Sequence, residues 1–559
     1  MKKTNIARLA VTAGLTLAMG AGMVAPATVA FADPTYGSGS ITINKQDEKY
    51  TQSFLGYRIF KANVQDNAAD TVTGKKESNI DWASDSVKTA VEGVIKAEDK
   101  NYAGTTAQDA ADWIVSRVTE TTTSTHVAGN SVAHKIAEAV KGAYTSGVSL
   151  TAGEAKTLDE GYWVFVKDPK SNLADGETGT APIFAVVGGS AVSVTEKVDT
   201  NTIPTPGKKQ VNKDDSTGDT DNGGSVAVGD TVTYELSATL PSNIKDYKTY
   251  KLEFTDTLSS GLTYKANVRN AKLVKADGTE TTLQNPDVTG DATAQTHVFT
   301  YADILKLLPS DYSYTAGDKI VFQYDAEVNS NAAAGQVISN QVALTYSNDP
   351  NSDGEGTSKD TPKVHEYTYN LILNKVDLGT EQSLSGAKFT VYSKAAKKYI
   401  KADGSKVDSA EDAKIEATNG TLTVQKLDAG EYTITETDAP STEYDKAAAF
   451  DINIKPRFKS DGTIVDLTNT MTGRDDLIGG TIDPSSTKGD NKLQAKDDTA
   501  TNANAGTVTV TVGDKKEITM PLTGMKGTTA LMVYGSAILV ISAAAYLRHK
   551  RNAENDDAE

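Results

Sequence analysis

The sequence predicts a mainly β protein built of tandem β-sandwich domains, and three observations support this. Val, Ile, Thr and Tyr recur in short alternating runs broken by Gly, Asp and Asn, which is typical of sandwich strands. The chain of 559 residues is long enough for about three or four such domains once its two ends are set aside. It contains no cysteine, so any covalent staple within a domain must be something other than a disulfide.

The N-terminus carries a targeting signal. A basic start is followed by an apolar run over residues 9–30, with small residues at Ala30 and Ala32. This order is typical of a secretory signal peptide. We therefore expect residues 1–32 to be removed by cleavage after Ala32.

The first unit, residues 33–204, is predicted to be mixed α+β. It opens with the strand SITINK and closes with PIFAVVGGSAVSVTEK. Between about residues 82 and 145, three stretches carry helical spacing instead: WASDSVKTAVEGVIKA, AQDAADWIVSRV and SVAHKIAEAVKGAY. The Pro-rich linker NTIPTPG then marks the end of the unit.

Two further units follow, at residues 205–362 and 363–519. The second contains the strand patterns DTVTYELSA, YKLEFTDTL, KIVFQYDAEV and QVISNQVALTYS, and it ends at the polar linker NDPNSDGEGTSKDTPK. The third begins at YTYNLILNKVD, continues through AKFTVYS and EYTITETDAP, and has a last predicted strand at GTVTVTVGDKK.

Charged residues occupy core-facing positions of these strands. Because side chains alternate between the two faces of a strand, Lys375, Glu436 and Asp514 share a face with the apolar residues of LILNK, YTITE and VTVTVGD. In the second unit, Lys209 shares parity with Val211. Asp256 and Asn340 are likewise aligned with the apolar residues of LEFTD and ISNQVAL.

Two interpretations of these charges are open. A lone buried charge is costly unless it is paired, so they form buried salt bridges or reach out to water from strand ends. Alternatively, each set forms a spontaneous isopeptide bond. Burial deprotonates a lysine into a nucleophile and keeps an acid protonated so that it polarises the target carbonyl. Two complete sets favour the bonds.

Family resemblance supports the bonds and gives the pairing. In the third unit, NKVD, LSGAKFTVY and GEYTITETDAP resemble the Cna-B-type domain of Gram-positive pilins. The resemblance implies an immunoglobulin-like, Cna-type sandwich in which Lys375 bonds an acceptor on the last strand and Glu436 assists. Asp514 is the preferred acceptor, and Asn469 is the alternative.

The second unit resembles the middle domain of fimbrial major subunits through KKQV, VGDTVTYEL, FTDTLSSGLTY and NQVALTYSNDP. This implies a bond between Lys209 and Asn340 with Asp256 assisting, and Lys208 and Lys213 are weaker candidates for the amine. In the first unit Lys45 shares a face with Ile41 and Ile43, but the last strand offers no Asn or Asp. We expect no bond in the first unit.

The C-terminal segment, residues 520–559, has three parts: a pentad, an apolar span over residues 529–547 and a basic tail over residues 548–551. The span is long enough for a membrane-spanning helix, and the tail favours a cytoplasmic end. The pentad consists of Met520, Pro521, Leu522, Thr523 and Gly524. The whole resembles the LPxTG sorting signal of Gram-positive wall proteins, with Met at the first position. The resemblance implies that sortase cuts between Thr523 and Gly524 and joins the Thr523 carbonyl to an amine.

The resemblance also implies what supplies that amine. The pilin motif V-x-V-Y-P-K corresponds to VSVTEK at residues 192–197, without the Tyr-Pro pair. Lys197 has the opposite parity to Val192 and Val194, so we expect it to face solvent and to be the linkage residue. Lys208 is the alternative.

The implied function is a structural shaft subunit of a covalent surface pilus that supports adhesion. It is secreted and attached to the cell wall, and its partners are sortase, other copies of the chain, tip or minor pilins and peptidoglycan. The alternative is a singly anchored adhesin that binds host matrix or glycan through its first domain.

Other function classes are not indicated. The net charge of −18 argues against nucleic-acid binding. The five histidines are scattered without metal-ligand spacing, so we expect no metal and no cofactor. With no Cys and no Ser-His-Asp arrangement in evidence, we expect no turnover enzyme.

Overall fold

The computed structural model describes residues 35–46, 52–69, 74–118, 126–173, 177–197, 202–214, 216–358, 360–472 and 506–516. The predicted signal peptide with its cleavage after Ala32, the pentad 520–524, the apolar span 529–547 and the basic tail 548–551 lie outside these residues. Across the described ranges, no helix has the length and apolar character needed to cross a membrane.

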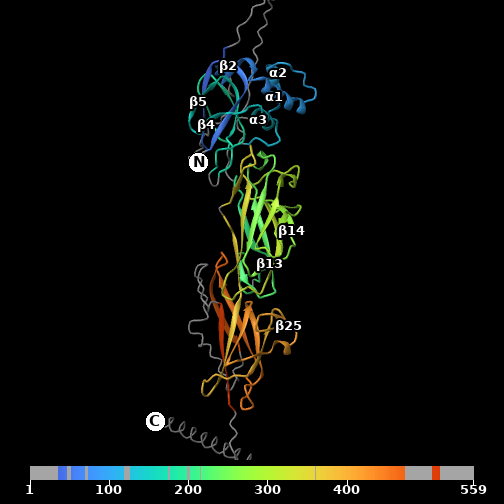
Figure 1. Ribbon diagram of the computed structural model, residues 1–559, viewed down its shortest axis with the longest axis vertical. Coiled ribbons are helices and arrows are strands. Elements are labelled where there is room, and N and C mark those ends of the chain that lie inside the picture. The colour runs from blue at the N-terminus through green and yellow to red at the C-terminus, as the bar shows by residue number, and fades with distance from the viewer. Residues whose placement is uncertain are drawn as a thin grey trace, which may run out of the picture.

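The chain forms three bodies in a line, which follow one another in sequence order from blue through green to orange (Figure 1). Each body contains two β-sheets. Alternating side chains of the strands are buried between the sheets, which gives each body its own apolar core. The prediction of a mainly β protein with tandem sandwich domains is confirmed.

The first body combines the sheets β5-β1-β8 and β3-β2-β6-β7, with β4 paired to β2. Three helices fall where helical spacing predicts them, and they pack beside β2, β3 and β6 around a second apolar cluster (Figure 1). Each helix begins at a side-chain cap, Ser84, Thr106 or Ser131. The elements are β1 (Ser38–Asn44), β2 (Ser53–Asp66), β3 (Lys75–Trp82), α1 (Asp85–Glu98), α2 (Ala107–Arg117), α3 (Val132–Gly142), β4 (Val148–Thr151), β5 (Ala155–Asp159), β6 (Gly161–Lys167), β7 (Ile183–Val187) and β8 (Val192–Thr195).

The middle body packs the sheet β10-β21-β19-β12-β17-β16 against the sheet β15-β14-β18-β11-β9. Strands β20 and β13 extend these sheets by pairing with β19 and β18. The elements are β9 (Pro206–Gln210), β10 (Gly223–Ser225), β11 (Thr231–Thr239), η1 (Ile244–Asp246), β12 (Leu252–Leu258), β13 (Leu262–Tyr264), β14 (Arg269–Val274), β15 (Glu280–Thr282), β16 (Asp287–Thr289), β17 (Thr296–Tyr301), η2 (Ile304–Lys306), β18 (Lys319–Val328), β19 (Ile338–Ser347), β20 (Glu355–Thr357) and β21 (Lys363–Tyr367).

The third body packs the sheet β27-β22-β31 against the sheet β25-β24-β23-β28-β29-β30, with β26 paired to β23. The elements are β22 (Tyr369–Asp377), β23 (Lys388–Ser393), β24 (Lys398–Ile400), β25 (Lys406–Val407), η3 (Glu411–Ala413), β26 (Ile415–Glu416), β27 (Thr421–Leu427), β28 (Gly430–Asp438), β29 (Phe450–Phe458), β30 (Ile464–Thr472) and β31 (Thr507–Asp514).

One boundary differs from the expected division at residues 362 and 363. Strand β21 pairs with β19 and β10, so it completes a sheet of the middle body. The third body then begins at β22, with a single residue between the two strands. The linker composition placed the boundary too early because a polar loop precedes β21 rather than following it.

Polar contacts join successive bodies. Between the first and the middle body, Lys167 and Asp349 form an ion pair of 3.5 Å whose side chains are 5% and 2% exposed. Between the middle and the third body, the Ser225 and Tyr369 hydroxyls are hydrogen bonded at 2.9 Å. A buried ion pair that spans two bodies restricts their relative motion, because separating the bodies would leave two desolvated charges without a partner.

Candidate functional site

A buried cluster of one amine and two carboxyl groups lies in the core of the third body. Lys375 on β22 donates to Glu436 Oε2 on β28 at 2.9 Å and also contacts Asp514 Oδ1 on β31. All three side chains are completely buried. The Lys375 amine also lies 5.5 Å from the centre of the Phe389 ring, so its surroundings are apolar beyond its two acid partners.

Burial sets the protonation of this cluster. Loss of water raises the pKa of both Glu436 and Asp514 above the ordinary carboxyl values, although the Lys375 amine opposes the shift. Glu436 is held in place by the Ala447 N–H, which donates to its Oε2 at 2.7 Å. In a pocket without water, protons can pass between the amine and the two carboxyl groups at a small cost in free energy. Acyl transfer from an acid to an amine requires such proton transfers.

The strand register places the amine and the acceptor side by side. Strands β22 and β31 pair in parallel, with Lys375 opposite Val512 and Asp377 opposite Asp514. Asp514 is therefore the diagonal neighbour of Lys375 on the inward face. The alternative acceptor, Asn469, belongs to β30, an edge strand of the opposite sheet. Its backbone pairs there with Ile454 of β29. The geometry therefore favours Asp514.

The middle body contains a second buried cluster, and here the expected amine is wrong. Lys208, not Lys209, contacts Asp256 Oδ1, and both side chains are completely buried. The Lys209 side chain is 45% exposed and lies 3.2 Å from Glu235. The parity assignment failed because it relied on Val211, which is 42% exposed and lies just beyond the end of β9.

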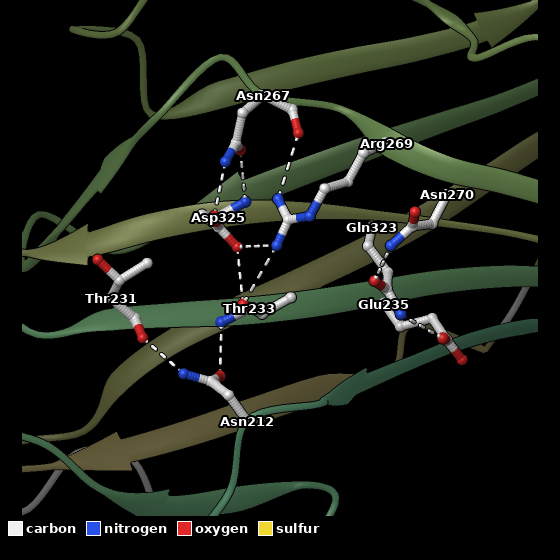
Figure 2. Close-up of polar contacts among 9 residues, drawn as sticks. All are labelled: Asn212, Thr231, Thr233, Glu235, Asn267, Arg269, Asn270, Gln323 and Asp325. Carbon is white, nitrogen blue, oxygen red and sulfur yellow. Dashed lines mark hydrogen bonds and ion pairs between the residues drawn. The ribbon is translucent and has the colours of Figure 1, made fainter.

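Lys209 faces outward from the sheet that contains β9, β11 and β18, beside Glu235. Figure 2 shows the polar contacts of Glu235 and its neighbours on that outer face. Glu235 accepts a hydrogen bond from Gln323, and Gln323 accepts one from Asn270. Arg269 donates to Asp325 at 2.6 Å on the same face. The third candidate amine, Lys213, is exposed and pairs with Asp221 at 2.9 Å. Neither Lys209 nor Lys213 faces the core.

The Asn340 amide completes the cluster, but it meets the acid through a hydroxyl. Asn340 Nδ2 donates to the Tyr324 hydroxyl at 2.6 Å, and that hydroxyl donates to Asp256 Oδ2. The hydroxyl also lies 3.4 Å from the Lys208 amine. Burial lowers the pKa of Lys208 to about 8 and raises that of Tyr324 well above its ordinary value. A larger share of Lys208 is therefore neutral near neutral pH than is usual for a lysine.

Sequence reasoning ranked Lys208 below Lys209 as the amine and missed Tyr324. The burial alternation in β9 runs through Pro206, Lys208 and Gln210. A five-residue strand with two adjacent lysines leaves this parity ambiguous. Tyr324 was detectable in principle, because it follows Ile320 and Phe322 at core parity and a buried tyrosine hydroxyl needs a partner.

The first body holds the expected linkage residue near its boundary with the middle body. Lys197 is half-buried, two residues beyond the end of β8, and its backbone N–H donates to the Thr180 hydroxyl at 2.7 Å. Thr180 in turn accepts, at its carbonyl, a hydrogen bond from Asn351 of the middle body. The expected exposure of Lys197 is thus only partial. Lys208 is unsuited to the alternative linkage role because it is buried in the core.

Lys45 is half-buried at the end of β1, near the buried carboxyl of Glu196. Among the described residues, no group of His and acid side chains has the arrangement of a metal site.

The chain was compared with protein families and known proteins. Residues 228–351 match a family model described as Gram-positive pilin backbone subunit 2, Cna-B-like domain, and residues 369–471 match SpaA, prealbumin-like fold domain. The chain is 25% identical over 437 residues to the trypsin-resistant surface T6 protein of Streptococcus pyogenes serotype M6, covering 69% of this chain and 72% of the relative.

Solved structures give similar matches. The T6 backbone pilin of Streptococcus pyogenes aligns with a TM-score of 0.45 and 15% identity, over 87% of this chain and 100% of that structure. The major pilin SpaD of Corynebacterium diphtheriae aligns with a TM-score of 0.40 and 16% identity, over 87% of this chain and 99% of that structure. The family matches thus identify a Gram-positive pilin backbone, Cna-B-like domain in the second unit and a SpaA, prealbumin-like fold domain in the third.

Proposed function

We propose that this chain is the shaft subunit of a covalently polymerised pilus on the surface of a Gram-positive bacterium, because its second unit matches a Gram-positive pilin backbone domain. Its role is structural. The name of the T6 relative describes a surface protein, and two of the similar solved structures are backbone or major pilins.

Each of the two buried clusters forms one intramolecular isopeptide bond. In the third unit, the Lys375 amine attacks the Asp514 carboxyl carbon, Glu436 gives a proton to the departing oxygen and takes one from the amine nitrogen, and water leaves. In the middle unit, Lys208 attacks the Asn340 amide carbon with Asp256 as the assisting acid, and ammonia leaves. Folding holds the reacting groups together, so no external enzyme is needed. These are single maturation steps.

The third-unit cluster joins the first and the last strand of its unit, and this position carries the proposal. Lys375 is on the first strand of the unit and Asp514 is on the last, and these strands are neighbours in parallel register. A pulling force that enters at the first strand and leaves at the last would pass through the bond rather than through the fold. This is the property that a shaft under tension needs.

Polymerisation joins one subunit to the next. Sortase cuts between Thr523 and Gly524 of one chain and transfers the Thr523 carbonyl to Lys197 of another. Such a head-to-tail contact is heterologous and does not close, so it generates a filament. The last subunit is joined to peptidoglycan, and tip or minor pilins complete the fibre.

The test is a blot of wall extracts boiled in detergent. Wild-type cells should give a ladder of high-mass species, which the Lys197→Ala variant should lose. The matched control is Lys156→Ala, which removes an exposed lysine of the same unit. A ladder that survives Lys197→Ala would move the linkage to another lysine. A wild type without any ladder would make the protein a singly anchored adhesin.

A further inference from the structure

The Tyr324 hydroxyl occupies the space between the acid and the amide of the middle-unit cluster. It donates to Asp256 Oδ2 and accepts from Asn340 Nδ2 at 2.6 Å. Asp256 contacts the Lys208 amine through its other oxygen, Oδ1. The four groups therefore form one continuous line: amine, carboxyl, hydroxyl and amide.

The Tyr324 ring is held in this position from several sides. Its neighbours are Phe299 at 5.3 Å, Tyr264 at 5.4 Å and Tyr234 at 5.7 Å between ring centres. Strand β18 pairs with β11, and Tyr324 lies directly opposite Tyr234. A ring fixed by packing keeps its hydroxyl within reach of both partners while the backbone is rigid.

We propose that Tyr324 is the proton-transferring residue of the middle-unit isopeptide reaction, passing a proton from Asp256 to the departing nitrogen of Asn340. This inference rests on the proposed bond between Lys208 and Asn340. It adds a fourth functional group to the amine, the acid and the amide. A hydroxyl suits the role because it donates and accepts at one atom and can rotate between the two directions.

The proton count closes without any other reactant. The neutral Lys208 amine attacks Asn340 Cγ, and the bond from Nζ to Cγ forms. The Tyr324 hydroxyl, which donates to Asp256 Oδ2 in the structure, first turns toward Asn340 Nδ2. One Nζ proton then moves to Asp256 Oδ1, and the proton of the neutral carboxyl at Oδ2 moves to the Tyr324 oxygen. The Tyr324 hydroxyl gives its own proton to Nδ2, the bond from Cγ to Nδ2 breaks, and ammonia leaves. Asp256 ends neutral and Tyr324 ends as a phenol.

The third-unit cluster shows why the middle unit needs this residue. There, the Lys375 amine contacts the assisting acid Glu436 and the acceptor Asp514 directly. In the middle unit the assisting acid is the shorter Asp256, and its contact with Asn340 runs through the hydroxyl.

The experiment follows bond formation in the full chain. Protein from cell-free synthesis is collected unfolded in acidic urea and diluted to start folding. Proteolytic peptides that contain joined Lys208 and Asn340 are then counted over time by mass spectrometry. Tyr324→Phe should slow this bond by about 100-fold or more, the range that general acid–base groups contribute. The third-unit bond in the same molecules should form at the wild-type rate.

Tyr301→Phe is the matched control. Tyr301 is 3% exposed in the same core, and its hydroxyl has no hydrogen-bond partner among the described residues. The Tyr301→Phe variant should form the middle-unit bond at the wild-type rate. If Tyr324→Phe does so as well, the transfer role is overturned while the bond itself stands. If the wild type never joins Lys208 to Asn340, both fail.

A second variant covers the case in which Tyr324→Phe does not fold. Replacing Tyr324 with 3-fluorotyrosine keeps the ring and the hydroxyl but makes the hydroxyl more acidic. A proton-transfer role predicts a rate change of about twofold or more, because the rate depends on the acidity of the transferring group. A purely structural role predicts an unchanged rate, and that result would overturn the proposal.

Discussion

Lys208 and Lys209 are consecutive in β9, yet their side chains lie on opposite faces of the sheet. The Lys208 side chain is completely buried beside Asp256, whereas that of Lys209 is 45% exposed beside Glu235. Two residues of the same type therefore differ only in the side of the sheet they face. This pair offers a direct test of whether the bond depends on burial.

The same substitution at the two lysines should have opposite outcomes. Lys208→Met removes the buried amine, so the middle unit should lose its cross-link and retain the ammonia. The deficit between the observed mass and the mass calculated from each chain's own sequence should then be about 17 Da smaller in the variant than in the wild type. Lys209→Met should keep the wild-type mass deficit. Lys208→Met should also lower the free energy of unfolding of the middle unit by about 3–5 kcal/mol, since Asp256 stays buried without its partner. Intact-mass spectrometry and chemical denaturation measure both effects.

A reversed pattern, with the mass deficit reduced in Lys209→Met alone, would contradict the structural assignment.

The sequence was sufficient for the fold and for most of the third-unit cluster. Long strands with strict alternation, such as those carrying Lys375 and Asp514, determine which face each residue occupies. Strand β9 has only five residues and starts with Pro-Gly, so its alternation is too short to choose between adjacent lysines. The role of Tyr324 depends on three strands meeting at one hydroxyl, and no local pattern contains that information.

The identity of the third-unit acceptor can be tested by exchanging the leaving group. The wild type should lose about 18 Da as water, and Asp514→Asn should lose about 17 Da as ammonia. The two cross-linked products are then chemically identical and should have the same mass, although their unjoined chains differ by about 1 Da. Asp514→Ala should form no third-unit bond, and Asn469→Ala should form it normally. Cross-linked peptides that contain residue 469 instead would assign the acceptor role to Asn469.

The first unit should become less stable as pH rises through the weakly acidic range. Glu196 is 3% exposed, and burial raises its pKa from 4.5 to about 7, with the nearby Glu177 adding to the shift. Between these two values the folded state binds more protons than the unfolded state, so stability falls as pH increases. The contribution is fully present below about pH 4.5 and is lost as pH passes about 7.

Glu196→Gln removes this titration and keeps an acceptor for the Gln46 N–H, which lies 3.1 Å from Glu196 Oε2. The variant should raise the melting temperature of the first unit at pH 7.5 by a few degrees and leave it unchanged near pH 4. Thermal proteolysis of the full chain, followed through peptides of β6, reports on this unit. Glu154→Gln changes an exposed glutamate and is the control. Equal pH profiles for both variants would show that Glu196 is not the titrating group.

The third-unit bond should make most of that unit inextensible. Lys375 and Asp514 are 139 positions apart, so a bond between them removes that length of chain from the path of a pulling force. Without the bond, the released segment adds about 3.3–3.6 Å per residue when the unit unfolds under load. Single-molecule pulling on the full chain should therefore show a step of about 480 Å in Lys375→Met that is missing from the wild type. Lys459→Met, at an exposed lysine of the same unit, should behave as the wild type does. A wild-type molecule with the same step would show that force passes through the fold of the third unit, and the shaft role would then lack its mechanical basis.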